Sequence, residues 1–243
     1  MNYSATSDLL LDSVILVTGA GDGIGAAVAK SYAKHGATVV LLDKNIKAVE
    51  KTYDDIEANG GKTPAIYPLD LMGASVTDYE TLASNIAENF GRLDGLVHCA
   101  ASLGQIASFD NQNTAIWLET LHINLTAPYL LTRACVAMLR QQEHGAIIFT
   151  SDDYKDKAYW AGYGVAKAGI ETLSKQLADE FESEGRLRVN CVIPGPVQTM
   201  LYARAFPGIN PNSLPLPEDL VSTYLYLMGK DSLTKTGQCF SAQ

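Results

Sequence analysis

The sequence predicts one doubly wound α/β domain, with a parallel sheet of about seven strands and helices on both faces. Three observations predict it. Short apolar segments rich in β-branched residues alternate with helix-length segments of periodic hydrophobicity along the whole chain. Glycine and asparagine close many of these segments, and no linker, repeat or low-complexity stretch divides residues 1–243. Repeated β–α units of this kind favour parallel strands joined by right-handed crossovers.

The individual elements follow from hydrophobic spacing and from helix stop signals. We expect strands at residues 13–17, 37–43, 63–70, 93–100, 145–151, 187–195 and 237–243. We expect helices at residues 23–35, 45–59, 76–90, 113–142, 161–184 and 218–228, with a break near residues 124–128 in the fourth. Residues 195–217 are rich in proline and irregular, which predicts either a lid over a partly hydrophobic substrate or a packed surface insertion.

Composition and charge exclude several classes of function. The net charge of −9 argues against nucleic acid and anionic membranes as partners, so a small molecule is the expected partner. The N-terminal residues lack the basic and apolar regions of a signal peptide, and no apolar run is long enough to span a bilayer. Scattered cysteines predict reduced thiols in a cytoplasmic protein. The four histidines have no metal-ligand spacing, so we expect no metal site.

A glycine-rich turn, Thr18–Gly25, follows the first expected strand and opens the first helix. Residues without a Cβ let the backbone approach a pyrophosphate, and the helix N-terminus offers free N–H groups to it. Asp43 ends the second strand, where a carboxylate accepts hydrogen bonds from an adenosine ribose and repels a 2′-phosphate. This predicts a Rossmann-type site for NAD. Lys44 could attract a phosphate instead, so NADP stays open, and Asp43 could also be a solvated loop residue.

Further motifs occur in a fixed order along the chain: Asp70 in PLDL, Asn124 in HINLTAPYLL, Tyr163-Gly-Val-Ala-Lys167, and Pro194-Gly195 followed by Thr199. Together with the glycine-rich turn they resemble the motifs of the short-chain dehydrogenase/reductase family, over essentially the whole chain. Among its members the chain is similar to poorly characterised bacterial oxidoreductases near the 3-oxoacyl reductases. The resemblance implies an NAD(P)-dependent oxidoreductase that interconverts a secondary alcohol and a ketone.

The resemblance also implies roles for particular residues. Tyr163 would be the general acid/base, Lys167 would favour its phenolate and bind the nicotinamide ribose, and Asn124 would hold a water that relays protons. The implied cofactor-binding residues are Gly19, Asp22, Gly23, Ile24, Gly25, Asp43, Asp70, Leu71, Ala100, Tyr163, Lys167, Pro194, Gly195 and Thr199. A homodimer or homotetramer, paired through helices around residues 118–140 and 161–184, is implied as well.

The family's active-site serine has no unambiguous counterpart. Counting forward from Gly145 places it at Asp152, and counting back from Tyr163 places it at Thr150. We expect Ser151, which lies between them, to be the catalytic serine, with Thr150 and Asp152 as alternatives. A carboxylate at this place would raise the pKa of Tyr163 and repel an alkoxide as it forms. The rival hypothesis is therefore a catalytically weak dinucleotide-binding sensor or scaffold.

Three other stretches depart from the family pattern or are unusual. Residues 98–101, His-Cys-Ala-Ala, stand where relatives have Asn-Asn-Ala-Gly, so we expect Cys99 to be a small buried filler rather than a reactive thiol. The C-terminal residues 240–243 differ from the usual tail, which we expect to affect subunit contacts rather than chemistry. The charged cluster at residues 152–157 is either a solvated rim or a polar wall for a charged substrate.

Overall fold

The computed structural model describes residues 3–243. They form one domain around a seven-stranded sheet in which every pairing is parallel, in the order β3-β2-β1-β4-β5-β6-β7. The strands are β1 (Val14–Thr18), β2 (Thr38–Asp43), β3 (Ala65–Pro68), β4 (Gly95–His98), β5 (Gly145–Thr150), β6 (Leu187–Ile193) and β7 (Cys239–Ser241). The helices are α1 (Gly23–Lys34), α2 (Ile46–Ala58), α3 (Val76–Phe90), α4 (Thr114–Leu121), α5 (Ala127–Arg140), α6 (Ala161–Phe181), α7 (Met200–Ala205) and α8 (Val221–Met228).

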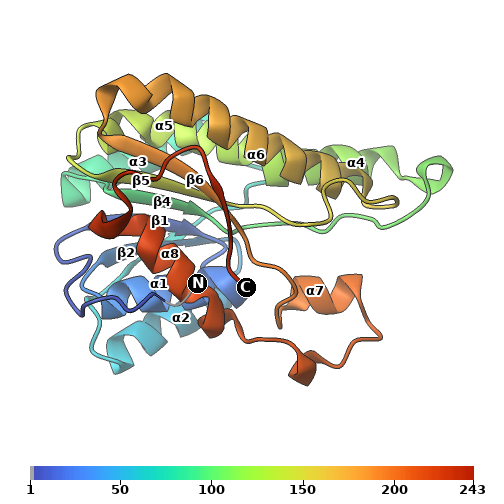
Figure 1. Cartoon of the computed structure of the whole chain (residues 1–243), viewed down its shortest axis with the longest axis horizontal. Coiled ribbons are helices and arrows are strands. Elements are labelled where there is room, and N and C mark those ends of the chain that lie inside the picture. The colour runs from blue at the N-terminus through green and yellow to red at the C-terminus, as the bar shows by residue number, and fades with distance from the viewer. Residues whose placement is uncertain (1–2) are drawn as a thin grey trace.

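The sheet separates two helical layers, as predicted. Figure 1 shows α3, α5 and α6 on one face and α1, α2 and α8 on the other, with α7 standing apart from both layers. Each face has its own hydrophobic core, one around Tyr32 and Tyr224, the other around Tyr79 and Phe149. Because the central strands are covered on both sides, β1 and β5 are buried at every residue and read as continuous apolar runs in the sequence.

Local sequence signals account for the helix ends. Asp22 caps α1, and Ser75 and Asp78 form a capping box at the start of α3. Gly91 ends α3 with a φ of 70°, a left-handed conformation that glycine adopts without steric penalty. The expected bounds of this helix, residues 76–90, are those observed.

Two regions differ in detail from the expected elements. The break in the long fourth helix is a π-helical turn, His122–Thr126, which joins α4 to α5. The segment 195–217 is not wholly irregular, because Thr199 caps the short helix α7 and Pro211–Ser213 forms a 3-10 turn. No helix in the described part of the chain is long and apolar enough to cross a membrane.

The sheet topology also places the functional residues. The strand order reverses between β1 and β4, so the crossovers leave on opposite sides and open a crevice at the carboxyl ends of these strands. The last residues of four neighbouring strands lie at this edge: Thr18 of β1, Asp43 of β2, His98 of β4 and Thr150 of β5. The edge is where the sequence predicts its dinucleotide site.

Candidate active site

A cavity of about 410 Å³ lies at this edge of the sheet. Its walls include every predicted cofactor residue: Gly19, Asp22, Gly23, Ile24, Gly25, Asp43, Asp70, Leu71, Ala100, Tyr163, Lys167, Pro194, Gly195 and Thr199. The cavity therefore joins the glycine-rich turn at one end to the Tyr163 pair at the other, and it brings residues from most of the strand ends together.

The glycine-rich turn is shaped by backbone contacts that leave no room for side chains. Gly19 has a φ of 68°, and a Cβ there would come within 2.8 Å of the backbone nitrogen of Ala100. A Cβ on Gly25 would run into the carbonyl oxygen of Gly19. The Asp22 carboxylate accepts a hydrogen bond of 2.7 Å from the Gly23 amide. This cradle at the N-terminus of α1 fits a pyrophosphate, which such an end binds through free N–H groups and the helix dipole.

Asp43 is held in place at the adjacent wall. Its carboxylate accepts hydrogen bonds from the backbone amides of Gly21, at 3.1 Å, and Asn45, at 2.9 Å. Lys44 reaches away from it, with its Nζ 4.0 Å from a carboxylate oxygen of Asp70. The wall of this end therefore presents a fixed negative charge, as the sequence predicted, while the neighbouring lysine is partly neutralised by Asp70.

Tyr163 and Lys167 lie on one face of α6 and are both buried, with exposed fractions of 3% and 4%. The Lys167 Nζ lies 5.4 Å from the centre of the Tyr163 ring and donates a hydrogen bond of 2.7 Å to the backbone oxygen of Thr150. Burial lowers the pKa of Lys167. The Tyr163 hydroxyl donates a hydrogen bond of 2.7 Å to the Asp152 carboxylate.

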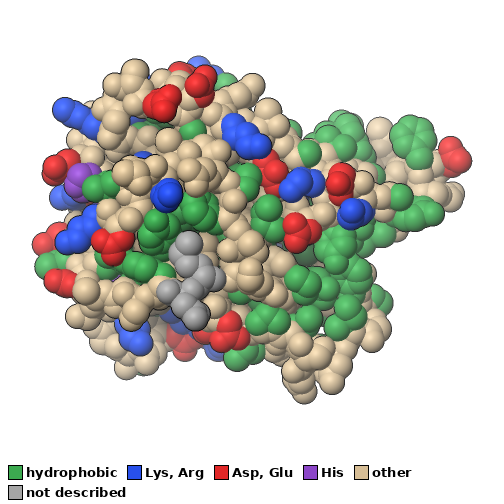
Figure 2. Space-filling model, in the orientation of Figure 1, with side chains coloured by type: hydrophobic (Ala, Val, Ile, Leu, Met, Phe, Trp, Pro, Cys, Tyr) green, Lys and Arg blue, Asp and Glu red, His purple; other side chains and the backbone are tan. Residues whose placement is uncertain are grey.

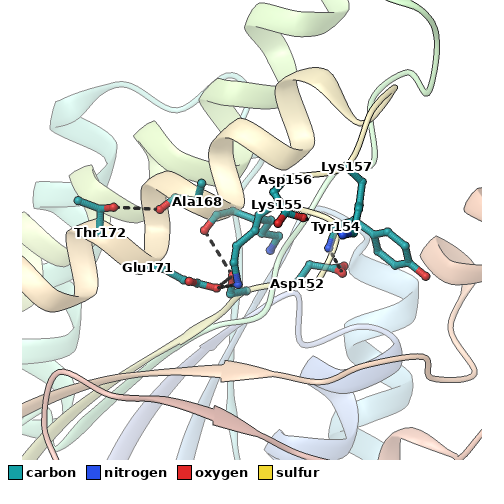
Figure 3. Close-up of polar contacts among 10 residues, drawn as sticks. Asp152, Tyr154, Lys155, Asp156, Lys157, Ala168, Glu171 and Thr172 are labelled. Carbon is teal, nitrogen blue, oxygen red and sulfur yellow. Dashed lines mark hydrogen bonds and ion pairs between the residues drawn. The ribbon is translucent and has the colours of Figure 1, made fainter.

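The expectation that Ser151 turns toward Tyr163 is wrong in this structure. The Ser151 Oγ donates instead to Glu171, at 2.8 Å, and Lys155 also binds Glu171, at 2.8 Å (Figure 3). The reason is strand register: the Ser151 amide continues the β5 ladder by donating to Val192, and neighbouring strand residues point in different directions. Asp152 therefore takes the position beside the tyrosine hydroxyl.

The Thr150 hydroxyl is used elsewhere too. It lies 3.0 Å from the Tyr224 hydroxyl and 3.4 Å from the Cys99 sulfur, on the side of the sheet that packs against α8. The hydroxyls of Thr150 and Ser151 are the two that the sequence offers as a second donor beside Tyr163. Both are bonded to other groups. Of the three alternatives, the structure selects Asp152.

The sequence predicts two opposing effects on the pKa of Tyr163. Lys167 would favour the phenolate and lower it, whereas a carboxylate at the serine position would raise it. In the structure the pKa of Tyr163 lies well above its ordinary value, because the ring is buried and because the Asp152 carboxylate accepts its hydrogen bond and repels a second negative charge. Tyr163 is therefore protonated in the free protein, and its hydroxyl is a weaker acid than an ordinary phenol.

Asn124 lies in the π-helical turn and is 2% exposed. Its amide donates to the backbone oxygens of Ser102 and Thr120, at 2.8 and 2.7 Å, and its side-chain oxygen accepts from the Ser102 amide at 3.1 Å. The side chain thus ties the loop after β4 to the kinked helix. It is not among the residues that line the cavity, and its predicted part in a proton relay stays a prediction.

Sequence reasoning missed several residues around the site. Glu171 was not singled out, although it follows Lys167 by four residues and so shares its helix face. The charged cluster divides: Asp152 and Lys155 bind side chains of α6, whereas Asp153 is exposed. The cavity wall also includes Met200, Leu201, Tyr202 and Arg204 of the segment that contains α7.

The altered residues after β4 serve the packing of the site. Cys99 is half-buried, and burial raises the pKa of its thiol to about 11, which agrees with a filler and not with a reactive thiol. His98 stacks on Phe149 with ring centres 4.7 Å apart, and its Nε2 lies 2.9 Å from the Thr132 hydroxyl. Burial lowers the pKa of His98 to about 3, so the ring is neutral.

The C-terminal residues contact the site directly, which the sequence did not predict. The Gln243 side-chain amide donates to the backbone oxygens of Pro194 and Pro196, at 2.8 and 2.6 Å. A Cβ on Gly195, which has a φ of 70°, would approach the same amide. The tail therefore braces the segment that leads from β6 into α7.

Comparison with known proteins agrees with this geometry. The family model described as short chain dehydrogenase matches residues 13–209. The chain is 40% identical to the uncharacterized oxidoreductase YciK of Escherichia coli K12 over 245 residues, covering 100% of this chain and 96% of the relative. It is 31% identical to the sorbose reductase of Schizosaccharomyces pombe over 236 residues, covering 91% of each protein.

A solved structure supplies a cofactor for comparison. The crystal structure of a short chain dehydrogenase from Shigella flexneri 2a, complexed with NADP, superimposes with a TM-score of 0.95 and 40% sequence identity. The match covers 98% of this chain and 100% of that one.

Proposed function

The chain belongs to the short chain dehydrogenase family of oxidoreductases, and we propose that it interconverts a secondary alcohol and a ketone with NAD(P) as the hydride carrier. One observation carries the proposal: a single cavity has the glycine cradle at one end and the buried pair Tyr163 and Lys167 at the other. The sorbose reductase among the relatives supports chemistry of this type.

The residues around the cavity fit a dinucleotide along its whole length. We propose that the α1 N-terminus binds the pyrophosphate and that Asp43 binds the adenosine ribose. Asp70 and Leu71 would flank the adenine, while Pro194 to Thr199 would hold the carboxamide of the nicotinamide. The close approach of Gly19 to Ala100 supports this, because a side chain at position 19 would collide with the Ala100 backbone and displace the turn that leads into the α1 N-terminus.

The chemistry assigns one role to each side chain near Tyr163. When bound, NAD(P)H supplies a hydride, two electrons and one proton, to the carbonyl carbon. Tyr163 donates its hydroxyl proton to the carbonyl oxygen, which gives the alcohol and leaves a phenolate that must regain a proton from water. Lys167 stabilises that phenolate through its charge and orients the nicotinamide ribose. Oxidation of the alcohol is the same sequence reversed.

For the cofactor we propose NAD in preference to NADP. The NADP in the Shigella relative does not support this choice. In this chain, however, Asp43 fixes a negative charge where an adenosine ribose would bind, and a 2′-phosphate would meet that charge. Lys44 is the residue that would favour NADP, and its approach to Asp70 weakens that effect.

A second function, a dinucleotide-binding sensor or scaffold with little catalysis, is favoured by one observation. The Tyr163 hydroxyl donates to Asp152, and the hydroxyls of Ser151 and Thr150 are bonded to other groups. Loss of a single hydrogen-bond donor of this type lowers rates by about a hundredfold or more. The two functions differ in turnover and agree in cofactor binding.

One experiment separates them. Calorimetry should detect binding of NADH to the purified protein, and absorbance at 340 nm should then show repeated turnovers with ketones or sugars. Binding with multiple turnovers supports the oxidoreductase. Binding without turnover for any carbonyl compound supports the sensor, and absence of dinucleotide binding contradicts both.

We also propose that residues 195–217 form a lid over the substrate and that the chain pairs into a homodimer or homotetramer through α4, α5 and α6. Apolar side chains on the lid and on these helices support both ideas, and Figure 2 shows green surface gathered on the projecting parts of the molecule. Met200, Leu118 and Val165 are 65%, 57% and 52% exposed. Light scattering tests the assembly.

We place the protein in the cytoplasm, in keeping with four free cysteines.

A further inference from the structure

The Asp152 carboxylate has no direct ion pair among the described residues; burial lowers the pKa of the nearby Lys167, and the Asp152 charge partly offsets that effect. Asp152 lines the cavity and receives the Tyr163 hydroxyl, at 2.7 Å, and the Tyr154 amide, at 3.3 Å. The two nearby lysines are turned to other partners: Lys155 binds Glu171 (Figure 3), and Lys167 donates to the Thr150 backbone oxygen. Among the ion pairs of the described residues, none includes Asp152.

This arrangement disfavours a simple ketone. To protonate a ketone, the Tyr163 hydroxyl must give up its hydrogen bond to the charged Asp152 carboxylate and bond to a neutral carbonyl oxygen. This exchange is unfavourable, because hydrogen bonds to a carboxylate are stronger than those to a neutral acceptor. The carbonyl oxygen would also gain negative charge beside the Asp152 carboxylate, which repels it. A substrate that brings its own donor removes both difficulties, because that donor replaces Tyr163 at the carboxylate.

We propose that Asp152 is a specificity-determining residue, which selects substrates that carry a hydrogen-bond donor, hydroxyl or ammonium, on the carbon next to the reacting carbon. The inference rests on the function proposed above. In such a substrate the carbonyl oxygen and the neighbouring donor lie about one hydrogen-bond length apart, as do the Tyr163 hydroxyl and the Asp152 carboxylate, at 2.7 Å. The substrate can therefore accept from Tyr163 and donate to Asp152 at the same time.

Apolar side chains pack around Tyr163. Tyr163 packs in a small cluster with Leu103 and Trp160, against which Leu201 and Phe206 of the α7 segment also pack. Leu103 and Leu201 face the cavity. A polar group such as Asp152, placed beside apolar walls, fixes the orientation of a ligand. The reaction itself is unchanged: the carbonyl gains a hydride and a proton, and the neighbouring hydroxyl or ammonium group is retained in the product.

A matched set of ring ketones tests the inference. The kcat/KM is measured with NADH for cyclohexanone, 2-hydroxycyclohexanone and 2-aminocyclohexanone, using the wild type, Asp152→Ser, Asp152→Asn and the control Asp153→Ser, a change at the exposed neighbour. We expect the wild type to favour a donor-bearing ketone by about a hundredfold, since an analogue without the donor leaves the Asp152 carboxylate without a hydrogen-bond partner. The hydroxyl and amine arms show which donor is selected.

Asp152→Ser should lose most of this preference, because a serine hydroxyl can itself donate to a carbonyl oxygen, and should gain activity toward cyclohexanone. Asp152→Asn keeps the shape of the side chain without its charge, and it should weaken the amine preference most. Asp153→Ser should match the wild type. Equal kcat/KM values for the three ketones in the wild type, or a preference that survives in Asp152→Ser, would overturn the inference.

Binding measurements keep the inference separate from the enzymatic proposal. Calorimetry of each ketone with the NAD⁺-loaded protein, with absorbance at 340 nm followed to detect any turnover, reports selection without catalysis. A donor preference in binding that Asp152→Ser abolishes, with no turnover of any ketone when NADH is supplied in place of NAD⁺, supports the inference while contradicting the oxidoreductase. Equal binding of the three ketones, or no binding of any of them, overturns it.

Discussion

The two ends of the cavity lie at the same edge of the sheet, but they differ in how closely their residues follow the family pattern. At the dinucleotide end, Gly19, Asp22 and Asp43 form a cradle of backbone and carboxylate contacts that agrees with the family pattern. At the other end, Tyr163 and Lys167 are in place but the second donor is missing, and Asp152 accepts the tyrosine hydroxyl instead. Under the proposed function, pyrophosphate binding depends on the first end and proton transfer on the second, so we expect substitutions to affect them separately.

The largest effect is expected from Tyr163→Phe. Removing the hydroxyl removes the proton donor, and general acid catalysis contributes about 10²–10⁴-fold in rate. We expect kcat to fall by about that factor while NADH affinity, measured by calorimetry, stays unchanged. Tyr159→Phe is the matched control, since Tyr159 lies in the turn just before α6 and is 61% exposed. Turnover that survives Tyr163→Phe would show that another group supplies the proton.

Gly19→Ala should break the opposite end. The added Cβ would meet the Ala100 backbone, and the φ of 68° is strained for any residue with a side chain. We expect NADH affinity to fall by about tenfold or more, because about 1–2 kcal/mol of strain accompanies a left-handed residue and the phosphate path narrows. Gly73→Ala, where nothing lies within 4 Å of the new Cβ, is the control. Equal losses in both variants would indicate a general effect on folding.

Acid should lower the free energy of unfolding, because His98 is buried in its neutral form. The pKa of His98 is lowered to about 3 by burial, so the folded protein binds a proton less readily than the unfolded chain does. This contribution to stability is fully present above the unfolded pKa of about 6.5 and is lost as the pH falls toward 3. We expect urea unfolding to show a loss of about 2 kcal/mol between pH 7 and pH 4.5 from this group.

His98→Gln should flatten that pH dependence, because glutamine does not titrate. The comparison is made between the slopes of the two proteins and not between their absolute stabilities, since the variant also loses the stacking on Phe149. Parallel slopes in the wild type and the variant would show that His98 is not the group that titrates.

The smallest effect concerns cofactor choice. Asp43→Ser removes the charge that would repel a 2′-phosphate, so the ratio of NADPH to NADH affinity should rise by about tenfold, or about 1.4 kcal/mol. Asp54→Ser, on the exposed side of α2, is the control. An unchanged ratio, or wild-type affinities that favour NADPH, would contradict the proposed role of Asp43.

Much of the fold and of the dinucleotide end of the cavity could be predicted from the sequence. The elements, the sheet and the residues of the cofactor wall follow from hydrophobic spacing and from motifs whose residues are fixed by backbone contacts, as at Gly19 and Gly25. The motifs are local signals in the sequence, although the contacts behind them are local only in part: Gly25 is constrained by Gly19, and Gly19 by Ala100 after β4.

The Tyr163 end could not be predicted in the same way. Whether Thr150, Ser151 or Asp152 faces the tyrosine depends on how far the β5 ladder continues and on where Glu171 sits one turn along α6. A shift of one residue reverses the direction of each side chain, and sequence counting has an error of that size. The contact between Gln243 and Pro194 joins residues far apart in the chain, with no local signal at either.

The ionisation of Tyr163 tests the central claim most directly, because it reports on the contact between Asp152 and Tyr163 without needing a substrate. Protein labelled with ¹³C at tyrosine Cζ would be titrated by NMR, with Tyr163→Phe used to assign the resonance and Asp152→Ser used to remove the carboxylate. We predict that Tyr163 in the wild type remains protonated above pH 10, and that Asp152→Ser lowers its pKa. A midpoint at or below 10 in the wild type, or an unchanged midpoint in Asp152→Ser, would contradict the account.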